Sequence, residues 1–327
     1  MRKLCSIADI FICLLILSCA TTVPVTVTRP ARLDLQGAKT IAVLPFQTSR
    51  AKTFDSTGSV YIDVINLLVY AGSGDDPNQI DAVQQLTETL TEDLSHSEYL
   101  TLIDADTVKQ ALEAKEKAPV DVYLTGQITH FDYSTMADDR TELVNGKSRP
   151  VRYFYKKVTA TISYKIIDSE TNRVIGYRTA DIGRTAGPER DILMLPSPYN
   201  IIRNDLDSVA VQILKDIQPY HTTLSLKMLK SKNKSVGIKA ADNLVKKGMI
   251  AEAETAYYSI YQSDKDFAAG YNAAKLMQAE GKLEDAKKLM NELVTTTGSK
   301  QAVSGLQSIQ YEIDQAEKLK QQQAQKQ

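Results

Sequence analysis

The sequence contains no tryptophan, only three histidines and only three cysteines among its 327 residues. No two of the histidines have metal-ligand spacing, and the motifs of zinc proteases, phosphate loops, serine hydrolases and dinucleotide-binding proteins are missing. Without tryptophan, a sugar-stacking platform would need tyrosine; Tyr153 and Tyr155, which alternate with Phe154, fit that role or ordinary strand packing. We therefore expect no catalytic residue, no metal site and no cofactor, so the protein is predicted not to be an enzyme.

An excess of charge of one sign and long apolar runs are also missing. Lys and Arg number 39 against 40 Asp and Glu, so nucleic acid is not an expected partner. The apolar run from Val60 to Ala71 contains Asp63 and Asn66 and is shorter than the roughly 20 apolar residues that cross a bilayer. We interpret this run as buried structure within a domain.

The amino-terminal residues have the pattern of an export signal. Arg2 and Lys3 precede an apolar stretch that ends in Ile16-Leu17-Ser18-Cys19. This ending resembles the lipobox of bacterial lipoproteins, which implies cleavage after Ser18 and a lipid on the Cys19 thiol. An ordinary secretory signal, cut elsewhere, is the alternative. We predict a lipoprotein signal peptide over residues 1–18 and a lipidated tether over residues 19–37.

The other cysteines agree with a lipoprotein. Cys5 and Cys13 lie inside the predicted signal peptide, so the mature chain keeps only Cys19 and forms no internal disulfide. Ala20, rather than Asp, follows the lipidated residue, which by the sorting rule of some enteric bacteria is compatible with the outer membrane. We expect a lipid-anchored protein of the cell envelope, on the outer membrane and facing the periplasm.

Residues 38–220 alternate between strand and helix patterns, which is typical of an α/β sandwich in two or three layers. The expected elements are strands at 39–46, 99–103, 120–131 and 157–166 with a hairpin partner at 173–184, and helices at 79–95, after 104 and at 199–217. The polar stretch 132–149 is expected to be loop and turn, with Asn145-Gly146 as turn residues. Gly126 more plausibly relieves crowding at its strand than cradles a ligand.

Four segments in order resemble landmarks of the curli-assembly CsgG superfamily of bacterial lipoproteins. They are Lys39-Thr-Ile-Ala-Val-Leu-Pro-Phe46, Leu100-Thr-Leu-Ile103, Asp121-Val-Tyr-Leu-Thr-Gly-Gln-Ile128 and Ile162-Ser-Tyr-Lys-Ile-Ile-Asp168. The sequence departs from the family pattern at Pro119-Val120, where Gly-Ala is common, and at Asn172, where Gly is common. The resemblance implies a CsgG-like α/β domain over 38–220, and its landmarks identify a fold and no chemistry.

The composition changes after Tyr220. Residues 221–235 are predicted to be a basic linker within a lysine-rich stretch, which is either solvated or faces an anionic surface such as a membrane. Gly248-Met-Ile-Ala-Glu-Ala253 and Gly281-Lys-Leu-Glu-Asp-Ala286 then repeat at a spacing of 33 residues. This repeat resembles tetratricopeptide helical hairpins, which implies an all-α domain with a capping helix over 236–319. A generic helical bundle is the alternative, and residues 320–327 are expected to be a Gln- and Lys-rich tail.

The sequence therefore predicts a non-enzymatic envelope lipoprotein that acts as a scaffold, assembly factor or regulator through protein–protein interaction. Its expected partners are envelope proteins or peptides and the membrane itself, and oligomers are possible. The alternative function is a ring-forming export channel of the CsgG type in the outer membrane. The residues expected to contact a partner lie in the repeats: Tyr257, Tyr258, Tyr261, Tyr271 and Asn272.

Overall fold

A computed structural model describes residues 22–50, 75–233 and 235–325 of the chain. The chain divides into two compact units. The unit called here the α/β unit holds residues 31–220 and the last residues from Gln322, and the helical unit holds the residues up to Pro30 and residues 221–321. The predicted signal peptide, the lipid site Cys19 and the apolar run 60–71 lie outside the described residues.

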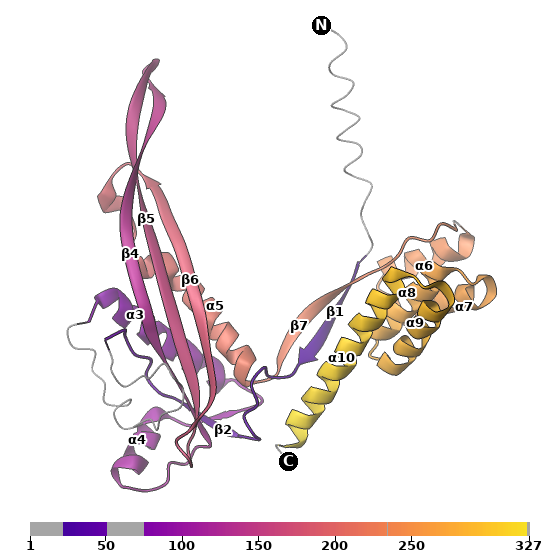
Figure 1. Cartoon of the computed structure of the whole chain (residues 1–327), viewed down its shortest axis with the longest axis horizontal. Coiled ribbons are helices and arrows are strands. Elements are labelled where there is room, and N and C mark those ends of the chain that lie inside the picture. The colour runs from indigo at the N-terminus through magenta and orange to yellow at the C-terminus, as the bar shows by residue number, and fades with distance from the viewer. Residues whose placement is uncertain (1–21, 51–74, 234, 326–327) are drawn as a thin grey trace. The chain divides into compact units, whose positions relative to one another are not determined.

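The α/β unit is built on a five-stranded mixed sheet in the order β3-β2-β4-β5-β6 (Figure 1). Its strands are β2 (Thr40–Val43), β3 (Thr101–Leu102), β4 (Val122–Val144), β5 (Lys147–Asp168) and β6 (Val174–Glu189). β2 pairs in parallel with β3 and β4, whereas β4, β5 and β6 pair antiparallel. The predicted hairpin between residues 157–166 and 173–184 is confirmed.

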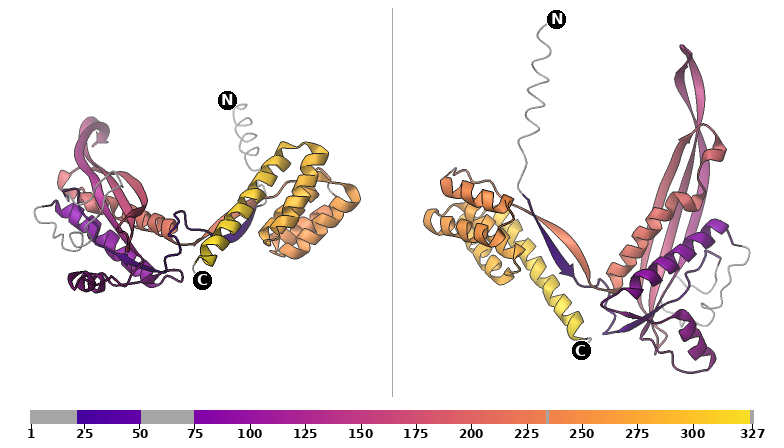
Figure 2. Two further views of the ribbon diagram at one scale, coloured as in Figure 1. Left: turned by 60° about the horizontal axis from the view of Figure 1, so that its bottom comes forward. Right: turned by 180° about the vertical axis from the view of Figure 1, so that it is seen from behind.

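Helices cover both faces of the β2 end of this sheet. α3 (Pro77–Ser95) and α5 (Pro198–Ile217) lie side by side on one face (Figure 2, right), and α4 (Ala105–Glu113) covers the other. Asp76 and Ser197 cap α3 and α5, and each helix begins with proline, a residue suited to the first turn. The mixed α/β class predicted from the sequence is confirmed.

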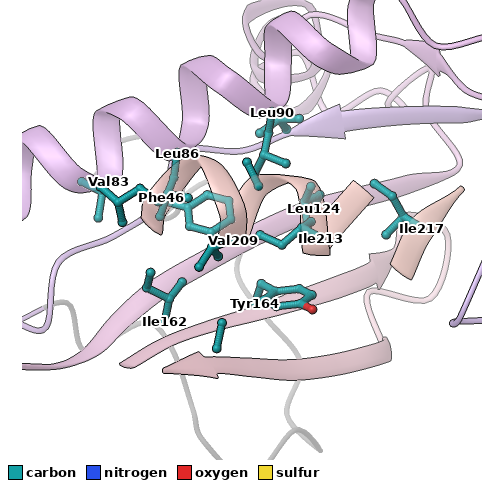
Figure 3. Packing of buried hydrophobic residues seen from close by; sticks show 14 of the residues in the cluster. Phe46, Val83, Leu86, Leu90, Leu124, Ile162, Tyr164, Val209, Ile213 and Ile217 are labelled. Atoms are coloured by element: carbon teal, nitrogen blue, oxygen red, sulfur yellow. The ribbon is translucent and has the colours of Figure 1, made fainter. Parts of the chain in front are cut away.

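The main core lies between α3, α5 and the sheet (Figure 3). Leu86 and Leu90 of α3 and Ile213 of α5 are fully buried against Ile162 and Tyr164 of β5. The Tyr164 hydroxyl donates to the buried Asp216 carboxylate over 2.5 Å, so this core contains one buried polar pair. The alternation of β5 supplies the apolar face that both helices need.

β4 and β5 form one long hairpin, and this corrects the loop predicted for residues 132–149. Their pairing continues without a break from the His130–Thr161 pair to the turn at Asn145-Gly146, where both residues have positive φ. The hairpin extends beyond the end of β6 (Figure 1). The prediction was wrong because this part of the hairpin is covered on neither face, so its strands lack the apolar alternation that marks a half-buried strand.

Gly126 relieves crowding, as predicted. A Cβ atom at this position of β4 would lie 2.2 Å from Cε1 of Phe46, whose ring is buried. The residue therefore has a packing role.

The helical unit contains a two-stranded sheet and a series of helices. Its elements are β1 (Thr22–Arg29), β7 (Tyr220–Lys227), α6 (Val236–Lys246), α7 (Ile250–Asp264), α8 (Phe267–Ala279), α9 (Leu283–Thr297) and α10 (Lys300–Ala324). Gly248 and Gly281 have positive φ between α6 and α7 and between α8 and α9. The repeat found in the sequence thus corresponds to two helical hairpins with matching turns.

β1 and β7 pair with each other, which corrects the predicted tether over 19–37 and the predicted linker over 221–235. Val23, Leu226 and Met228 are buried in the same apolar cluster as the helices. Apolar residues alternate with polar ones in both segments, and this alternation gives each strand one face to bury. Among the described residues, no helix has the length and apolar character needed to cross a membrane.

Candidate functional site

The structure places four of the five predicted partner-binding residues inside the helical unit. Tyr257, Tyr261, Tyr271 and Asn272 have exposed fractions of 1%, 3%, 9% and 2%, whereas Tyr258 is 39% exposed. The four buried side chains have a packing role, and direct contact with a partner stays a prediction for Tyr258 alone.

The buried tyrosines are also fixed by carboxylates. The Tyr257 hydroxyl donates to Asp242, and the Tyr261 hydroxyl donates to Glu292 over 2.8 Å. Burial together with the Glu292 hydrogen bond raises the pKa of Tyr261 to about 12, and burial together with the Asp242 hydrogen bond also raises the pKa of Tyr257. Both phenols stay neutral donors at physiological pH, so each one joins two neighbouring helices.

Asn272 holds a segment of the chain itself. Its Oδ1 accepts from the Leu229 backbone N–H over 2.7 Å, and its Nδ2 donates to the Leu229 carbonyl over 2.9 Å. A side-chain amide that bonds both backbone groups of one residue is a way to hold an extended peptide without reading its side chain. Here the peptide is the segment that follows β7.

The same segment closes the inner face of the repeats. Every residue from Ala268 to Gln278 of α8 is buried, so this helix is enclosed on all sides. Leu226 of β7 and Met228, just after it, pack into the apolar cluster of the helical unit. Gly305 of α10 lies so close to Met290 and Tyr271 that a Cβ atom there would lie 2.8 Å from the Met290 methyl. The helical hairpins therefore present no open peptide groove at Asn272, because the chain fills that position.

A buried ion pair joins β1 to α10. The Arg29 guanidinium donates to both oxygens of Glu312, each over 2.7 Å, and the side chains are 7% and 10% exposed. Lys275 of α8 is buried nearby and donates to Gln278 over 2.9 Å. Burial lowers the pKa of Lys275 to about 8, although the Glu312 charge opposes that shift.

The outer end of the β4–β5 hairpin, residues 137–154, is called here the arm. It begins where the pairing of β5 with β6 ends, at the Phe154–Glu189 pair. Leu143 near its turn is 80% exposed, and neither face of the arm is covered by a helix. The only sequence feature of the arm that is typical of a strand is the alternation of aromatic residues around Phe154.

Arginine side chains organise the surface of the arm. Arg152 donates to both oxygens of Asp139 across the strands, over 2.8 and 3.0 Å, and these hydrogen bonds lower the pKa of Asp139. The Arg140 guanidinium lies 5.4 and 5.6 Å from the ring centres of Tyr153 and Tyr155. The arm is therefore an ordered surface of arginine and tyrosine, residue types that are enriched where proteins bind tightly.

Exposed apolar side chains follow β6, whose last residue, Glu189, pairs with Phe154 at the base of the arm. The short 3-10 helix η1 (Ile192–Met194) follows β6, and its Leu193 and Met194 are 85% and 69% exposed. Arg190, between β6 and η1, donates to Glu142 of the arm over 2.5 Å and to the Tyr153 hydroxyl over 3.2 Å. This contact ties the segment that carries the exposed residues to the arm.

The part of the chain that the structure describes contains no group of three or more His, Cys, Asp or Glu side chains that could hold a metal ion. His96 lies at the end of α3 with Nδ1 3.0 Å from the Glu92 carbonyl, and Nδ1 of His221 lies 3.2 Å from the Thr28 hydroxyl. His96 also lies 3.1 Å from the Ser95 hydroxyl, whereas the His221 contact joins β7 to β1, and both histidines are exposed.

Comparisons with known proteins give no sequence relative, since no family model and no curated protein matches the chain. Solved structures match parts of it. The PelC dodecamer from Paraburkholderia phytofirmans is 14% identical with a TM-score of 0.29, covering 61% of this chain and 99% of its own. Lipoprotein GNA1162 from Neisseria meningitidis is 12% identical with a TM-score of 0.24, covering 54% of this chain and 97% of its own. A minor lipoprotein from Acinetobacter baumannii is 17% identical with a TM-score of 0.23, covering 43% and 86%. These values are too low to transfer a ligand, partner or assembly to this chain.

Proposed function

We propose that this chain is a lipid-anchored protein of the cell envelope that binds another envelope protein through the arm. In this role it has no chemistry of its own and acts as a scaffold, assembly factor or regulator. The observation that carries the proposal is the arm itself, an ordered ribbon that supports no core of its own unit.

The energetics of the arm favour a binding role. An isolated two-stranded ribbon is marginally stable in water, so its order must come from specific cross-strand contacts. Those contacts are present in the Arg152–Asp139 pair and in the Arg140–tyrosine stack. A surface that combines rigid aromatic and arginine side chains with exposed apolar residues such as Leu193 is typical of a protein–protein interface.

The lipid anchor is supported by the residues Ile16-Leu17-Ser18-Cys19 at the end of the apolar amino-terminal stretch. Metabolic labelling with a radioactive fatty acid tests it. We expect label on the parent chain and none on Cys19→Ala, and label that persists in the variant would contradict the anchor.

The family resemblances belong to the same proposal. For the α/β unit we propose a CsgG-like domain, supported by the landmark strands β2, β4 and β5 in the expected order. For α6 to α9 we propose tetratricopeptide-type hairpins, supported by the matching turns at Gly248 and Gly281.

A photo-cross-linking residue at Leu143, near the turn of the arm, tests the binding role in cells. We expect a discrete protein adduct from Leu143 and none from the control position Val303, which is 39% exposed on α10. Arg140→Glu with Arg152→Glu should abolish the Leu143 adduct while the lipid label stays. An adduct that is equally strong at Val303, or unchanged in the charge-reversed arm, would refute this role.

A ring-forming export channel is the second candidate, and one observation favours it. β4 and β5 continue as paired strands through residues 132–149, where the sequence predicted a loop. Charged residues on both faces of the arm, including Asp138 on one and Asp139 on the other, count against a lipid-facing position. Single-particle images of the lipidated protein in mild detergent distinguish the two, because a closed ring with a pore would favour the channel.

A further inference from the structure

The first strand of the helical unit begins close to the proposed lipid site. Thr22 opens β1 and follows Cys19 by three residues, which span at most about 10 Å when fully extended. Thr28 near the end of β1 lies 3.2 Å from His221 near the start of β7, so these paired strands run in opposite directions (Figure 1). The beginning of β1 therefore lies beside the end of β7.

Lysines gather at that end of β7. Lys227 is the last residue of the strand, Lys230 and Lys232 follow on the segment that leads into α6, and Lys239 lies in the first turn of α6. All four side chains are exposed, and among the described residues no ion pair uses them. These four residues are called here the lysine cluster.

The neighbouring acidic side chains are already engaged. Asp242 of α6 accepts from the Tyr257 hydroxyl, and Asp266 accepts from the Ser231 hydroxyl and caps α8 through the Ala269 N–H. The positive charge of the lysine cluster is therefore not cancelled within its own surroundings. A ligand that neutralises it must bring negative charge.

An exposed apolar residue lies within the lysine cluster. Val236, the first residue of α6, is 85% exposed, although Ile238 two residues later is buried. Lysines around one exposed apolar side chain suit the boundary between lipid headgroups and water, where the aliphatic stem of lysine and the apolar residue reach inward.

We propose that the lysine cluster binds the phosphate groups of anionic phospholipids in the leaflet that holds the lipid of Cys19. This inference rests on the lipid anchor of the proposed function. The reach of at most about 10 Å from Cys19 to β1 keeps the cluster within roughly one Debye length of the headgroups, which is about 8 Å at physiological salt and about 10 Å at 0.1 M, so salt weakens the attraction without abolishing it.

The expected size of the effect follows from the number of lysines. One basic residue close to an anionic leaflet strengthens association about fivefold. Four of them together strengthen it several hundred-fold, and salt weakens the effect. Replacement of all four should therefore abolish the association of this surface with anionic lipid.

The absence of tryptophan makes a direct test possible, because one introduced tryptophan is the only such fluorophore in the chain. The full lipidated chain with Val236→Trp is incorporated into vesicles of phosphatidylcholine, or of phosphatidylcholine and phosphatidylglycerol in a two-to-one ratio, each with brominated acyl chains. We expect strong quenching of the tryptophan in the anionic vesicles at low salt and little in the neutral ones. Replacing the four lysines of the cluster by glutamine should reduce the anionic value to the neutral one.

Two controls match this design. A tryptophan at Val303 of α10 reports on a surface away from the lysine cluster and should show no dependence on phosphatidylglycerol. A second fourfold variant removes the same charge from exposed lysines outside the cluster and should leave the quenching at Val236→Trp unchanged; its residues are Lys288, Lys300, Lys318 and Lys320.

The outcomes separate this inference from the proposed function. Quenching that is equal in both lipids, or unchanged without the cluster lysines, overturns the lipid-binding role of the cluster. If the chain nevertheless stays on the vesicles after a salt wash, the lipid anchor is still supported. A chain that a salt wash releases from phosphatidylcholine vesicles has no anchor, which overturns the proposed function. Lysine-dependent quenching on anionic vesicles would in that case still support the cluster as a lipid-binding surface.

Discussion

The replacement Glu312→Gln should strongly destabilise the helical unit. It keeps the shape of the side chain and one acceptor oxygen, but it removes the charge that pairs with Arg29. Arg29 is 6% exposed, so its guanidinium would remain buried with a neutral partner in place of a carboxylate.

Two contributions set the magnitude. Removing one partner of a buried ion pair costs about 3–5 kcal/mol, because the other charge is left uncompensated. The Glu312 charge also raises the pKa of Lys275 against the effect of burial, so its loss makes the charged form of Lys275 less favourable as well. The cation–π contact of Arg29 with Tyr311, at 5.3 Å, is unaffected by the replacement and therefore does not change this difference. We expect a loss of about 3–5 kcal/mol.

The assay is urea unfolding of the full chain, followed by circular dichroism and by hydrogen exchange of peptides from β1 and α10. Because the chain has two units, exchange in those peptides assigns the change to the helical unit. Glu317→Gln, at an exposed glutamate of the same helix, is the matched control and should change the unfolding free energy by less than about 0.5 kcal/mol.

The double variant Arg29→Met with Glu312→Leu separates charge from packing. Replacement of a whole buried pair by apolar residues is often close to neutral, so the double variant should be more stable than Glu312→Gln alone. If Glu312→Gln costs less than about 1 kcal/mol, or if the double variant is the less stable of the two, the reasoning about a buried uncompensated charge is refuted.

Three further predictions concern buried positions in either unit. Lys275→Met should raise stability at pH 7 by up to about 3 kcal/mol and remove a pH dependence of the parent. The pKa of Lys275 is about 8 in the folded chain and 10.5 in the unfolded chain, so between these values the unfolded chain binds more protons. The stability of the parent should therefore rise with pH from 8 to 10.5 and that of the variant should not, as denaturant titrations at several pH values would show. Gly126→Ala should cost about 1–3 kcal/mol in urea unfolding, because its methyl group would overlap the buried Phe46 ring; an unchanged midpoint would contradict that contact. Tyr164→Phe should cost about 1–3 kcal/mol, because it removes the hydroxyl that donates to the buried Asp216. A thermal midpoint equal to that of the parent would contradict this and mean that Arg32 and Arg178 stabilise the Asp216 carboxylate without the hydroxyl.

The core of the α/β unit could be predicted because the apolar residues of its elements recur with regular spacing along the face that packs into it. Residues 158–166 alternate regularly, and α3 repeats its apolar residues at helical spacing. The steric role of Gly126 also followed from its place within a strand. Local pattern suffices when the chain buries the same face along a whole element.

The arm could not be predicted for the opposite reason. Residues 137–144 and 147–154 pair with each other and cover nothing, so polar and charged residues occur on both faces. Such strands differ from a polar loop only in their cross-strand pairs, for example Arg152 with Asp139, and a single sequence does not show which residues face each other.

The sequence did not show which residues of the helical unit are buried. Tyr271 and Asn272 were predicted to contact a partner, but both are buried, and Asn272 instead bonds the backbone of Leu229, more than forty residues away in the sequence. The pair of Arg29 with Glu312 joins residues still farther apart. Contacts between such distant residues leave no periodic pattern in the sequence, so the sequence did not show which residues contact each other.

The pairing of β1 with β7 changes what a lipid on Cys19 would do. As a free tether, residues 19–37 would let the folded protein move up to about 60 Å from the membrane. With β1 built into the helical unit from Thr22, only two residues, Ala20 and Thr21, separate Cys19 from a strand that is fixed by Arg29 and Glu312. The reach falls to about 10 Å, so the helical unit stays at the membrane surface and a partner must meet it there. A lysine cluster beside the start of β1 therefore lies close enough to the leaflet to interact with headgroups. Lysines at the end of a tether of about 60 Å would spend most of their time beyond the range of the headgroup charge.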